Sequence, residues 1–465
     1  MALNAVNPAA RVPLQLPPAT TPLAQGMHRL QERLHESQWW APELLRERQF
    51  QQLSALLLHA AATVPFYAER LKAAGFRRGM TLTDASWLRL PILTRAELQA
   101  AGDRLASKRL PPSHGRSHEI RTSGSTGQPV RIRSSDLAQT WFRAVGLREA
   151  LWQRRDFSGT FAAIRKFEEN NMAPPPDGER LKRWGDYGTY PFATGPAVRL
   201  SLLASVTQQA EWLQRHNPHY LLTYPSNLAA LAEYCRGAGV ALSNLRQVLS
   251  IAELLPPETR SLVREAWGVS IADIYSCKEV GYLALQCPEH EGHLHVQSET
   301  VLLEVLDEQG RPCAPGAVGR VVVTPLYNFA MPLLRYAIGD YAMVGGSCPC
   351  GRGLPVLDRV QGRVRNMLTT PDGGRYWPSF GSRRFREIAP IRQHQFVQKS
   401  PNRLQARLAV ERPLTPEEEA TLRAHILTRL PAAFEIEFVY VDEIPVSAAG
   451  KLENFISEID GTAAR

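Results

Sequence analysis

Hydrophobic residues near the start of the chain follow helical periodicity. Between residues 26 and 75, leucines recur at spacings of three and four, which places them along one side of a helix. The segment Trp39-Trp40-Ala41-Pro42 interrupts this stripe, because proline inside a helix removes a backbone donor, so we expect two successive helices. Farther on, Thr94 and Glu97 have the spacing of a capping box, which predicts that another helix begins at Arg95.

The centre of the chain alternates apolar runs with amphipathic segments. Asp136 is the predicted N-cap of a helix from Leu137 to about Gln153. Four apolar runs predict strands: Phe161–Ile164, Tyr220–Thr223, Val248–Ile251 and Ile271–Tyr275. Two segments between them predict helices, one capped by Ser226 and continuing through Cys235, and one from Pro256 to Trp267. Strands and helices that alternate in this way indicate a parallel sheet with crossover helices.

The predicted sheet also indicates where a ligand would bind. Ligands of open parallel sheets lie at the carboxyl ends of the strands. Tyr224, Ala252 and the segment from Tyr275 to Glu279 each end or follow a predicted strand. We therefore expect them around one crevice.

Beyond Val296 the pattern becomes rich in β-strands, and after Gly362-Arg363 a smaller domain begins, in which Thr415 caps a helix between strands. The predicted fold class is α/β. A flexible N-terminal arm (1–25) precedes a large domain (26–363), which combines parallel sheets, crossover helices and a β-rich subdomain. A small α+β domain (364–465) follows.

Composition narrows the function classes. The formal net charge of +9 is spread along 465 residues. Nucleic-acid binding favours a clustered basic stripe, so we expect no nucleic-acid partner, and the dispersed charge suits small polyanions. No apolar run is long enough to span a bilayer, and the Pro- and Ala-rich start lacks the pattern of a secretory signal. We expect a cytoplasmic protein with reduced cysteines and no membrane partner.

A run of hydroxyl side chains and glycines is the strongest local signal. Glycine lets backbone N–H groups turn toward one point, and Ser and Thr add donors, so the run predicts a phosphate-binding loop. It matches neither the Walker pattern nor the dinucleotide fingerprint. The alternative is a polar surface turn. The loop residues are Thr122, Ser123, Gly124, Ser125, Thr126 and Gly127.

Cysteine and histidine spacing predicts a metal site. Cys287 and His295 lie upstream of the Cys348-Pro-Cys350 segment, and such a set can close a tetrahedral Zn²⁺ site of structural type. His293 shares a predicted strand face with His295 and is the alternative ligand. The other interpretation is reduced cysteines beside exposed histidines.

Six motifs in order resemble the adenylate-forming (acyl/aryl-CoA synthetase) superfamily, and more narrowly its phenylacetate-CoA ligase and capsule-biosynthesis-like group. They cover the chain from about Leu90 to Lys451. The motifs are Thr122–Pro129, Tyr275–Glu279, Gly319–Thr324 with Tyr327–Pro332, Arg335–Asp340, Gly362-Arg363 and Gly450-Lys451. Some relatives in this group carry a similar Cys/His set.

The resemblance implies a nucleotide site. It assigns the loop that opens at Thr122 to the β- and γ-phosphates of ATP, and Glu279 to Mg²⁺. It implies that Tyr275, with Ser276 beside it, stacks on adenine, and that Asp340 accepts hydrogen bonds from the ribose hydroxyls. Without a nucleotide, Glu279 would be a surface carboxylate, Tyr275 a core tyrosine and Asp340 an aspartate in a turn.

The resemblance also implies a mobile C-terminal domain. Arg363 would contact the nucleotide near a hinge, and Lys451 would reach the α-phosphate during adenylation and withdraw afterwards. The alternatives are an exposed arginine and a solvated terminal lysine. The chain departs from the common family pattern at Val130, Lys278 and Arg365, and Lys278 puts the substrate side of the pocket in doubt.

The implied function is ATP-dependent activation of a small carboxylic acid, followed by transfer to coenzyme A. The pocket is expected around Tyr224, Ala252 and Gly281, and aromatic residues near Trp184 favour an aromatic acid. An amine or a carrier-protein thiol could replace coenzyme A as acceptor, and a non-catalytic nucleotide-binding protein is the second alternative. A homodimer is compatible with this function.

Overall fold

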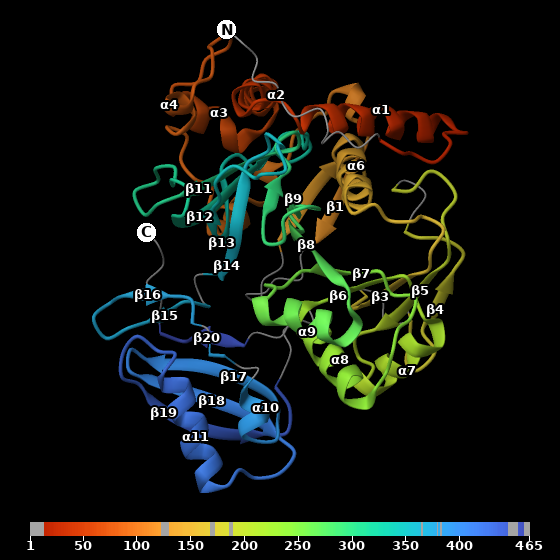
Figure 1. The fold of residues 1–465 in the computed structure, drawn as a ribbon. Helices are drawn as coiled ribbons and strands as arrows, with labels where there is room; N and C mark the ends of the chain where they lie inside the picture. Colours follow the sequence, from red (N-terminus) through yellow and green to blue (C-terminus); the bar gives the residue numbers. More distant parts are fainter. Residues whose placement is uncertain are drawn as a thin grey trace. The chain divides into compact units, whose positions relative to one another are not determined.

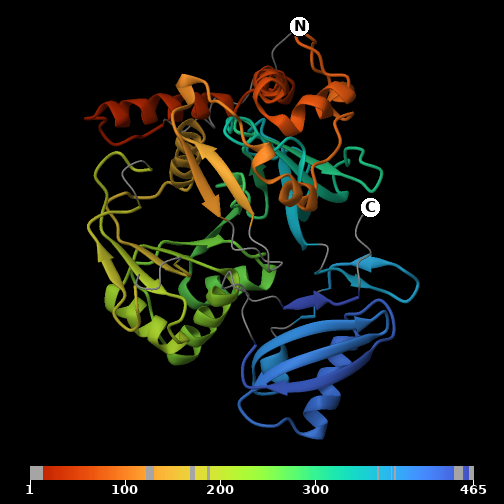
Figure 2. The ribbon, with the colours of Figure 1, turned by 180° about the vertical axis from the view of Figure 1, so that it is seen from behind.

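The computed structural model describes residues 14–121, 130–167, 173–185, 189–363, 366–378, 380–381, 384–444 and 454–459. The chain forms two compact units, Met1–Val360 and Gln361–Arg465 (Figures 1 and 2). The predicted boundary after Arg363 lies close to this division. Among the described residues, no helix has both the length and the apolar character needed to cross a membrane.

Helices and short 3₁₀ turns form the start of the first unit. The predicted break near Pro42 is confirmed, and Pro65 adds a second break that the leucine pattern did not indicate. The first helix begins at Pro22, capped by Thr21, while residues 1–13 of the predicted arm lie outside the described residues. The elements are α1 (Pro22–Ser37), α2 (Pro42–Thr63), α3 (Pro65–Ala73), α4 (Asp84–Trp87), α5 (Arg95–Ala101), η2 (Gly102–Leu105) and η3 (Pro112–His114).

One 12-stranded sheet runs through the described part of the first unit, in the order β11-β12-β13-β14-β10-β9-β8-β7-β6-β3-β5-β4. The pairs β6–β7 and β7–β8 are parallel, as predicted, and so are β5–β3 and β3–β6, of which β5 was not predicted as a strand. Strand β8 then pairs antiparallel with β9. The parallel and β-rich parts are therefore continuous. The strands up to this change of direction at β8 are β3 (Phe161–Arg165), β4 (Glu179–Leu181), β5 (Ala197–Ser201), β6 (Tyr220–Thr223), β7 (Gln247–Ile251) and β8 (Ser270–Cys277).

The antiparallel part packs against the N-terminal helices. Leu53 and Leu56 of α2 share a buried core with Val321 and Val323 of β12, and Figure 1 shows α2 and α3 beside β11 and β12. The strands are β9 (Gly281–Gln286), β10 (Leu294–Val296), β11 (Val301–Leu306), β12 (Val318–Pro325), β13 (Tyr336–Val344) and β14 (Val356–Arg363).

Helices cover the parallel part. Crossovers α7 (Val206–His216), α8 (Pro225–Ala238) and α9 (Pro257–Trp267) bury one core with β6 and β7, and Figure 1 shows them together on one face. Helix α6 (Asp136–Trp152) contributes Val145 and Trp152 to a separate core with Leu249 and Leu285. A two-stranded ribbon, β1 (Ser117–Arg121) and β2 (Arg131–Ser135), precedes α6.

Two predicted helix caps are wrong. Ser135, not Asp136, caps α6, because its side chain accepts a hydrogen bond from the Ala138 N–H. Asp136 is the first helical residue, and its carboxylate accepts from the Arg116 N–H instead. The second wrong cap is Ser226, which lies inside α8 because Pro225 opens that helix. The residue before the helix, Tyr224, makes no side-chain cap. The predicted capping box at Thr94 and the predicted cap at Thr415 are confirmed, and Thr415 also forms a capping box with Glu418.

The second unit is a separate α+β fold. Its four-stranded sheet has the order β19-β18-β17-β20, with β17–β18 antiparallel and the outer pairs parallel. Phe396 and Leu404 of the sheet share a core with Leu422 and Ile426 of α11. The elements are β15 (Leu368–Thr369), β16 (Arg375–Tyr376), α10 (Phe385–Ile388), β17 (Ile391–Ser400), β18 (Arg403–Val410), α11 (Pro416–Leu427), β19 (Glu435–Val441) and β20 (Phe455–Ser457).

Candidate functional site

The carboxyl end of β8 brings Tyr275, a predicted nucleotide residue, into contact with Asp340. The Tyr275 hydroxyl donates a 3.0 Å hydrogen bond to Asp340 Oδ2, across 65 residues of sequence. Ser276 follows Tyr275 in β8 at an irregularity in the pairing with β9. Burial raises the pKa of the Cys277 thiol, and the negative charges of Glu279 and Asp340 raise it further. The carboxylates of Glu279 and Asp340 therefore both influence the ionisation of the Cys277 thiol.

Glu279 forms an ion pair that the sequence did not predict. Arg95 Nη1 lies 3.3 Å from Glu279 Oε1, and the two side chains are 27% and 12% exposed. Arg95 is the first residue of α5, so the capping box at Thr94 sets its position. The sequence showed where α5 begins, but it contained no signal that pairs residues 184 positions apart.

A cavity of about 240 Å³ lies beside Glu279. Gly281, a predicted pocket residue, lines it, as do Ile120 and Ser134 from the strands that flank the predicted phosphate loop. The cavity therefore adjoins both the end of β8 and the β1–β2 ribbon. Its other lining residues are Ala138, Gln139, Trp141, Phe142, Val145, Cys277, Lys278, Glu279, Val280, Tyr282, Thr300, Val301, Pro325, Tyr327 and Asn328.

Two stacked aromatic pairs form the walls of this cavity. The ring centroids of Phe142 and Tyr282 are 4.8 Å apart, and those of Trp141 and Tyr327 are 4.5 Å apart. Gly281 has a φ of +104°, and a Cβ there would lie 3.0 Å from the Phe142 ring. A side chain at this position would strain the turn and press on the aromatic wall.

Tyr224 and Ala252 follow β6 and β7, as predicted, but they are not among the residues that line this cavity. The first turn of α8 is joined to the loop after β7, because the Ser226 N–H donates to the Glu253 carboxylate at 3.0 Å. Ala252 has a φ of +70°, an uncommon conformation for a residue with a side chain. The substrate roles of Tyr224 and Ala252 stay predictions.

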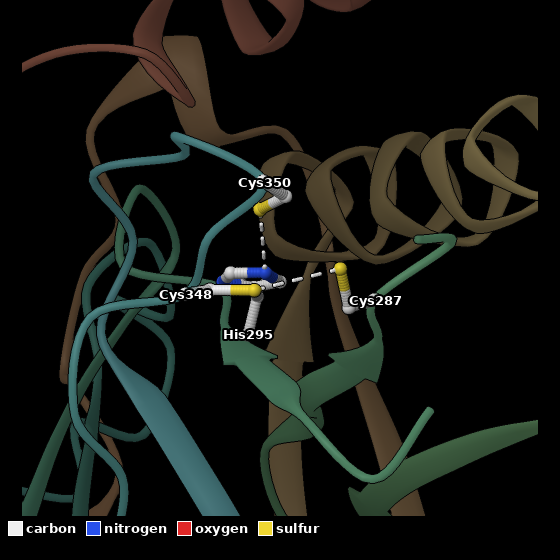
Figure 3. Close-up of side chains that lie close together, drawn as sticks. All are labelled: Cys287, His295, Cys348 and Cys350. Carbon is white, nitrogen blue, oxygen red and sulfur yellow. Dashed lines mark hydrogen bonds between the residues drawn. The ribbon is translucent and has the colours of Figure 1, made fainter. Parts of the chain in front are cut away.

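The predicted zinc residues lie together in the first unit. One ligand atom from each of Cys287, His295, Cys348 and Cys350 falls within 4.8 Å of all the others, and all four residues are buried. Figure 3 shows the Cys287 and Cys350 side chains pointing toward the His295 ring, with the Cys348 sulfur beside it. Cys287 follows β9, His295 lies in β10, and the other two cysteines share one loop.

The separations in this cluster fit a tetrahedral metal site. Zn–S bonds of about 2.3 Å place neighbouring sulfurs about 3.8 Å apart. Cys287 Sγ and Cys348 Sγ are 3.8 Å apart, and Cys350 Sγ lies 3.4 Å from His295 Nε2. The other ring nitrogen of His295, Nδ1, faces the Leu354 carbonyl at 3.4 Å, which orients Nε2 toward the sulfurs.

His293, the alternative ligand, lies beside the cluster and not in it. Its Nδ1 is 3.1 Å from Cys348 Sγ, and its Nε2 faces Asp358 at 3.9 Å. The contact with Cys348 suits a residue that orients a metal ligand by a hydrogen bond and does not bind the metal itself.

Several predicted site residues lie outside the described part of the chain. They are Thr122, Ser123, Gly124, Ser125, Thr126, Gly127 and Lys451. Arg363 ends β14, and its carbonyl accepts a 3.4 Å hydrogen bond from Trp377 Nε1. The roles of all these residues remain predictions.

Comparisons with known proteins agree on the fold. The family described as the CapK C-terminal domain matches residues 368–458. A phenylacetate-coenzyme A ligase of Thermus thermophilus is 32% identical over 167 residues, which cover 35% of this chain and 38% of that protein. The corresponding ligase of Escherichia coli is 26% identical over 168 residues, covering 35% of this chain and 38% of that protein. These alignments thus span under two fifths of the relatives' length.

Solved structures cover more of the chain. A 2-hydroxyisobutyryl-CoA ligase, in the postadenylation state with an acyl-AMP, has a TM-score of 0.73 at 19% identity and covers 96% of this chain and 94% of that one. An anthranilate CoA ligase with anthranoyl-AMP has a TM-score of 0.52 at 18% identity, with coverage of 72% and 65%. At this identity the likeness establishes the fold.

Proposed function

We propose that the chain belongs to the adenylate-forming superfamily, in its phenylacetate-CoA ligase and capsule-biosynthesis-like group, and that it activates a carboxylic acid with ATP and transfers the acyl group to coenzyme A. The observation that carries this proposal is the hydrogen bond between Tyr275 and Asp340 beside Glu279 and an aromatic cavity. These side chains, from β8, β13 and the turn after β8, are the ones the motifs assign to the nucleotide.

The proposed reaction has two steps. In the first, a carboxylate oxygen of the acid attacks the α-phosphorus of ATP, the bond to the bridging oxygen of the β-phosphate breaks, and pyrophosphate leaves. In the second, the coenzyme A sulfur attacks the acyl carbon, the bond to the AMP oxygen breaks, and the thiol proton is released. Carboxylate, α-phosphate and leaving group are all negative, so catalysis depends on positioning and charge neutralisation.

Each described residue has a proposed task. Asp340 accepts hydrogen bonds from the ribose, and the Tyr275 ring stacks on adenine beside Ser276. Glu279 would hold Mg²⁺, which reduces the negative charge on the phosphates when bound. Its carboxylate suits this ion, since Mg²⁺ prefers oxygen ligands, and its pairing with Arg95 shows that it already attracts a cation.

Other tasks rest on the resemblance alone. Thr122 to Gly127 would cradle the β- and γ-phosphates, and Lys451 would reach the α-phosphate. Arg363 would contact the nucleotide near a hinge. Magnesium, a cytoplasmic location and a homodimeric assembly likewise remain predictions.

We also propose a structural zinc ion at Cys287, His295, Cys348 and Cys350. The 3.8 Å and 3.4 Å separations support a closed four-ligand site, which leaves no position for substrate. Its role would be to join the loop after β9 to the loop that carries Cys348 and Cys350. A metal is suited to that task because it cross-links segments distant in sequence.

The acceptor distinguishes the remaining alternatives. An amine acceptor would make the protein an amide synthetase, and a carrier-protein thiol would make it a loading enzyme. A non-catalytic nucleotide-binding protein is opposed by the presence of Glu279, Asp340 and Lys451 in one chain.

ATP–pyrophosphate exchange tests the first step. The acid panel should contain phenylacetate, benzoate, anthranilate and 2-hydroxyisobutyrate, and we expect exchange with at least one aromatic acid. Coenzyme A, an amine and a carrier protein are then compared as acceptors of the acyl group. ATP binding without exchange for any acid would contradict the enzyme hypothesis.

A further inference from the structure

Arg352 lies beside the cysteine cluster and is not a lining residue of the cavity. It follows Cys350 by two residues, and its backbone N–H donates a hydrogen bond to the Cys350 sulfur. The Arg352 side chain is only 7% exposed. An arginine is rarely buried without partners, because its charge gives up water. The partners of Arg352 therefore indicate its role.

The Arg352 guanidinium contacts two indole rings. Its central carbon, Cζ, lies 4.8 Å from the ring centroid of Trp39 and 4.9 Å from the ring centroid of Trp152. Both tryptophans are buried. A guanidinium within about 6 Å of an indole centroid is attracted to the ring, and the attraction is strongest where water is excluded. These contacts therefore hold the arginine in place.

Polar contacts join the same guanidinium to two other segments of the chain. Arg352 Nε donates a 3.0 Å hydrogen bond to Gln38 Oε1, and Arg352 Nη1 lies 3.3 Å from Glu289 Oε1. Gln38 lies between α1 and α2, and Glu289 lies between β9 and β10. One side chain thus connects both segments to the loop that carries Cys350.

Gly353 brings the backbone of this loop against the segment between α1 and α2. Its N–H donates a 2.9 Å hydrogen bond to the Gln38 carbonyl. A Cβ at position 353 would lie 1.8 Å from the Trp40 carbonyl oxygen, so this approach requires glycine. Residues 348–353, which we call the metal loop, therefore meet residues 38–40 through side-chain and backbone contacts.

Trp152 connects the metal loop to helix α6. It is the last residue of that helix. Its ring lies 5.8 Å from the His295 ring at an interplanar angle of 83°, an edge-to-face contact. One indole thus contacts both a proposed metal ligand and Arg352.

We propose that Arg352 is a positioning residue for the metal site, which holds the metal loop against residues 38–40 and the end of α6. This inference rests on the proposed zinc ion. Release of the ion requires Cys348 and Cys350 to move away from it, and the contacts of Arg352 oppose that movement. Outer partners of this kind orient the ligands and raise the affinity of a site for its metal.

The rate of zinc release tests this role without any measurement of ligase activity. The full chain, loaded with zinc, is mixed with excess chromogenic chelator, and absorbance follows the release. Arg352→Met should release zinc about 10- to 100-fold faster, the range in which loss of an outer partner weakens metal binding. Arg352→Lys keeps the charge but not the planar group, so its rate should lie between the two. Arg236→Met, at an exposed ion pair, is the matched control and should release zinc at the wild-type rate.

A double-mutant cycle tests the contact with the indole. Trp39→Leu alone should also speed zinc release. In the Arg352→Met background the same change should have a smaller effect, because the contact between the two side chains is already lost. If the two factors multiply instead, Trp39 and Arg352 act independently, and the proposed contact does not hold the metal loop.

The outcomes separate this inference from the zinc proposal. If the wild type binds zinc and Arg352→Met releases it at the same rate, the positioning role is wrong while the metal site stands. If the wild type binds no zinc, the metal site fails and this inference fails with it. Where Arg352→Met does not fold, Arg352→Lys gives the answer, and zinc release at the wild-type rate in that variant would overturn the role.

Discussion

The Tyr275 hydroxyl and the Asp340 carboxylate, from β8 and β13, are joined by a partly buried hydrogen bond of 3.0 Å. The bond orients one oxygen of the Asp340 carboxylate. The tyrosine thus contributes a ring and also fixes the aspartate. This geometry predicts different effects for the two residues.

Asp340→Ala should weaken AMP binding more than Tyr275→Phe. The alanine removes the ribose acceptor, while phenylalanine keeps the ring and loses one hydrogen bond, worth about 0.5–1.5 kcal/mol, or up to about tenfold in affinity. Calorimetric titration of AMP measures both variants. Tyr234→Phe in α8 is a matched control that should bind normally. Unchanged affinity in Asp340→Ala would remove Asp340 from the nucleotide site.

Arg95→Gln should reduce the Mg²⁺ concentration needed for half-maximal pyrophosphate exchange, by about two- to fivefold. The reason is that Arg95 competes for the Glu279 carboxylate at 3.3 Å. A magnesium titration of exchange activity measures the change, with Arg78→Gln, at an exposed site, as control. A higher magnesium requirement would mean that Arg95 supports metal binding.

Purified protein should contain about one zinc per chain. Cys350→Ser should lose it and lower the thermal unfolding midpoint, because the remaining buried ligands are left without their metal. Cys313→Ser changes a cysteine outside the cluster and should retain the metal. Elemental analysis decides: equal zinc content in the two variants would exclude this site.

Arg335→Met should destabilise the first unit by about 3–5 kcal/mol, since it leaves a buried carboxylate without its partner. Arg335 Nη2 lies 3.0 Å from Glu304 Oε1, with the side chains 3% and 7% exposed. Urea unfolding followed by tryptophan fluorescence reports this unit, because every tryptophan except Trp377 precedes residue 361. Arg236→Met breaks the exposed pair with Glu265 and should cost less than about 1 kcal/mol. An equal loss of unfolding free energy in Arg335→Met and Arg236→Met would contradict the importance of burial for the first ion pair.

Glu299 should make stability sensitive to acid. Burial raises the pKa of its carboxyl, but the charge of Arg148 and hydrogen bonds from Arg148 and Ser37 outweigh this, so the pKa lies below its ordinary value. The resulting stability is present above the unfolded pKa of about 4.3 and is lost as pH falls through the folded pKa. Between pH 6 and 3.5, urea midpoints of the wild type should fall more than those of Glu299→Gln. Glu265→Gln, at an exposed ion pair, should behave like the wild type.

Local patterns determined most elements correctly for a physical reason: helix caps and apolar periodicity act within a few residues. The capping box at Thr94 and the strand Tyr220–Thr223 are examples. Where two neighbouring residues could both cap a helix, as at Ser135 and Asp136, the local pattern does not show which of them is the cap. The hydrogen bond to the Arg116 N–H, from another segment, gives Asp136 a different partner.

By itself, then, the sequence determined the succession of strands and helices, the order of the motifs and the candidate residues for binding nucleotide or metal. Only the tertiary structure decided which of them meet. It paired Arg95 with Glu279, brought His295 rather than His293 among the cysteine sulfurs, and put Lys278 in the wall of an aromatic cavity while Tyr224 and Ala252 do not line it. These contacts depend on how strands distant in sequence lie side by side in one sheet, and no local propensity encodes that arrangement.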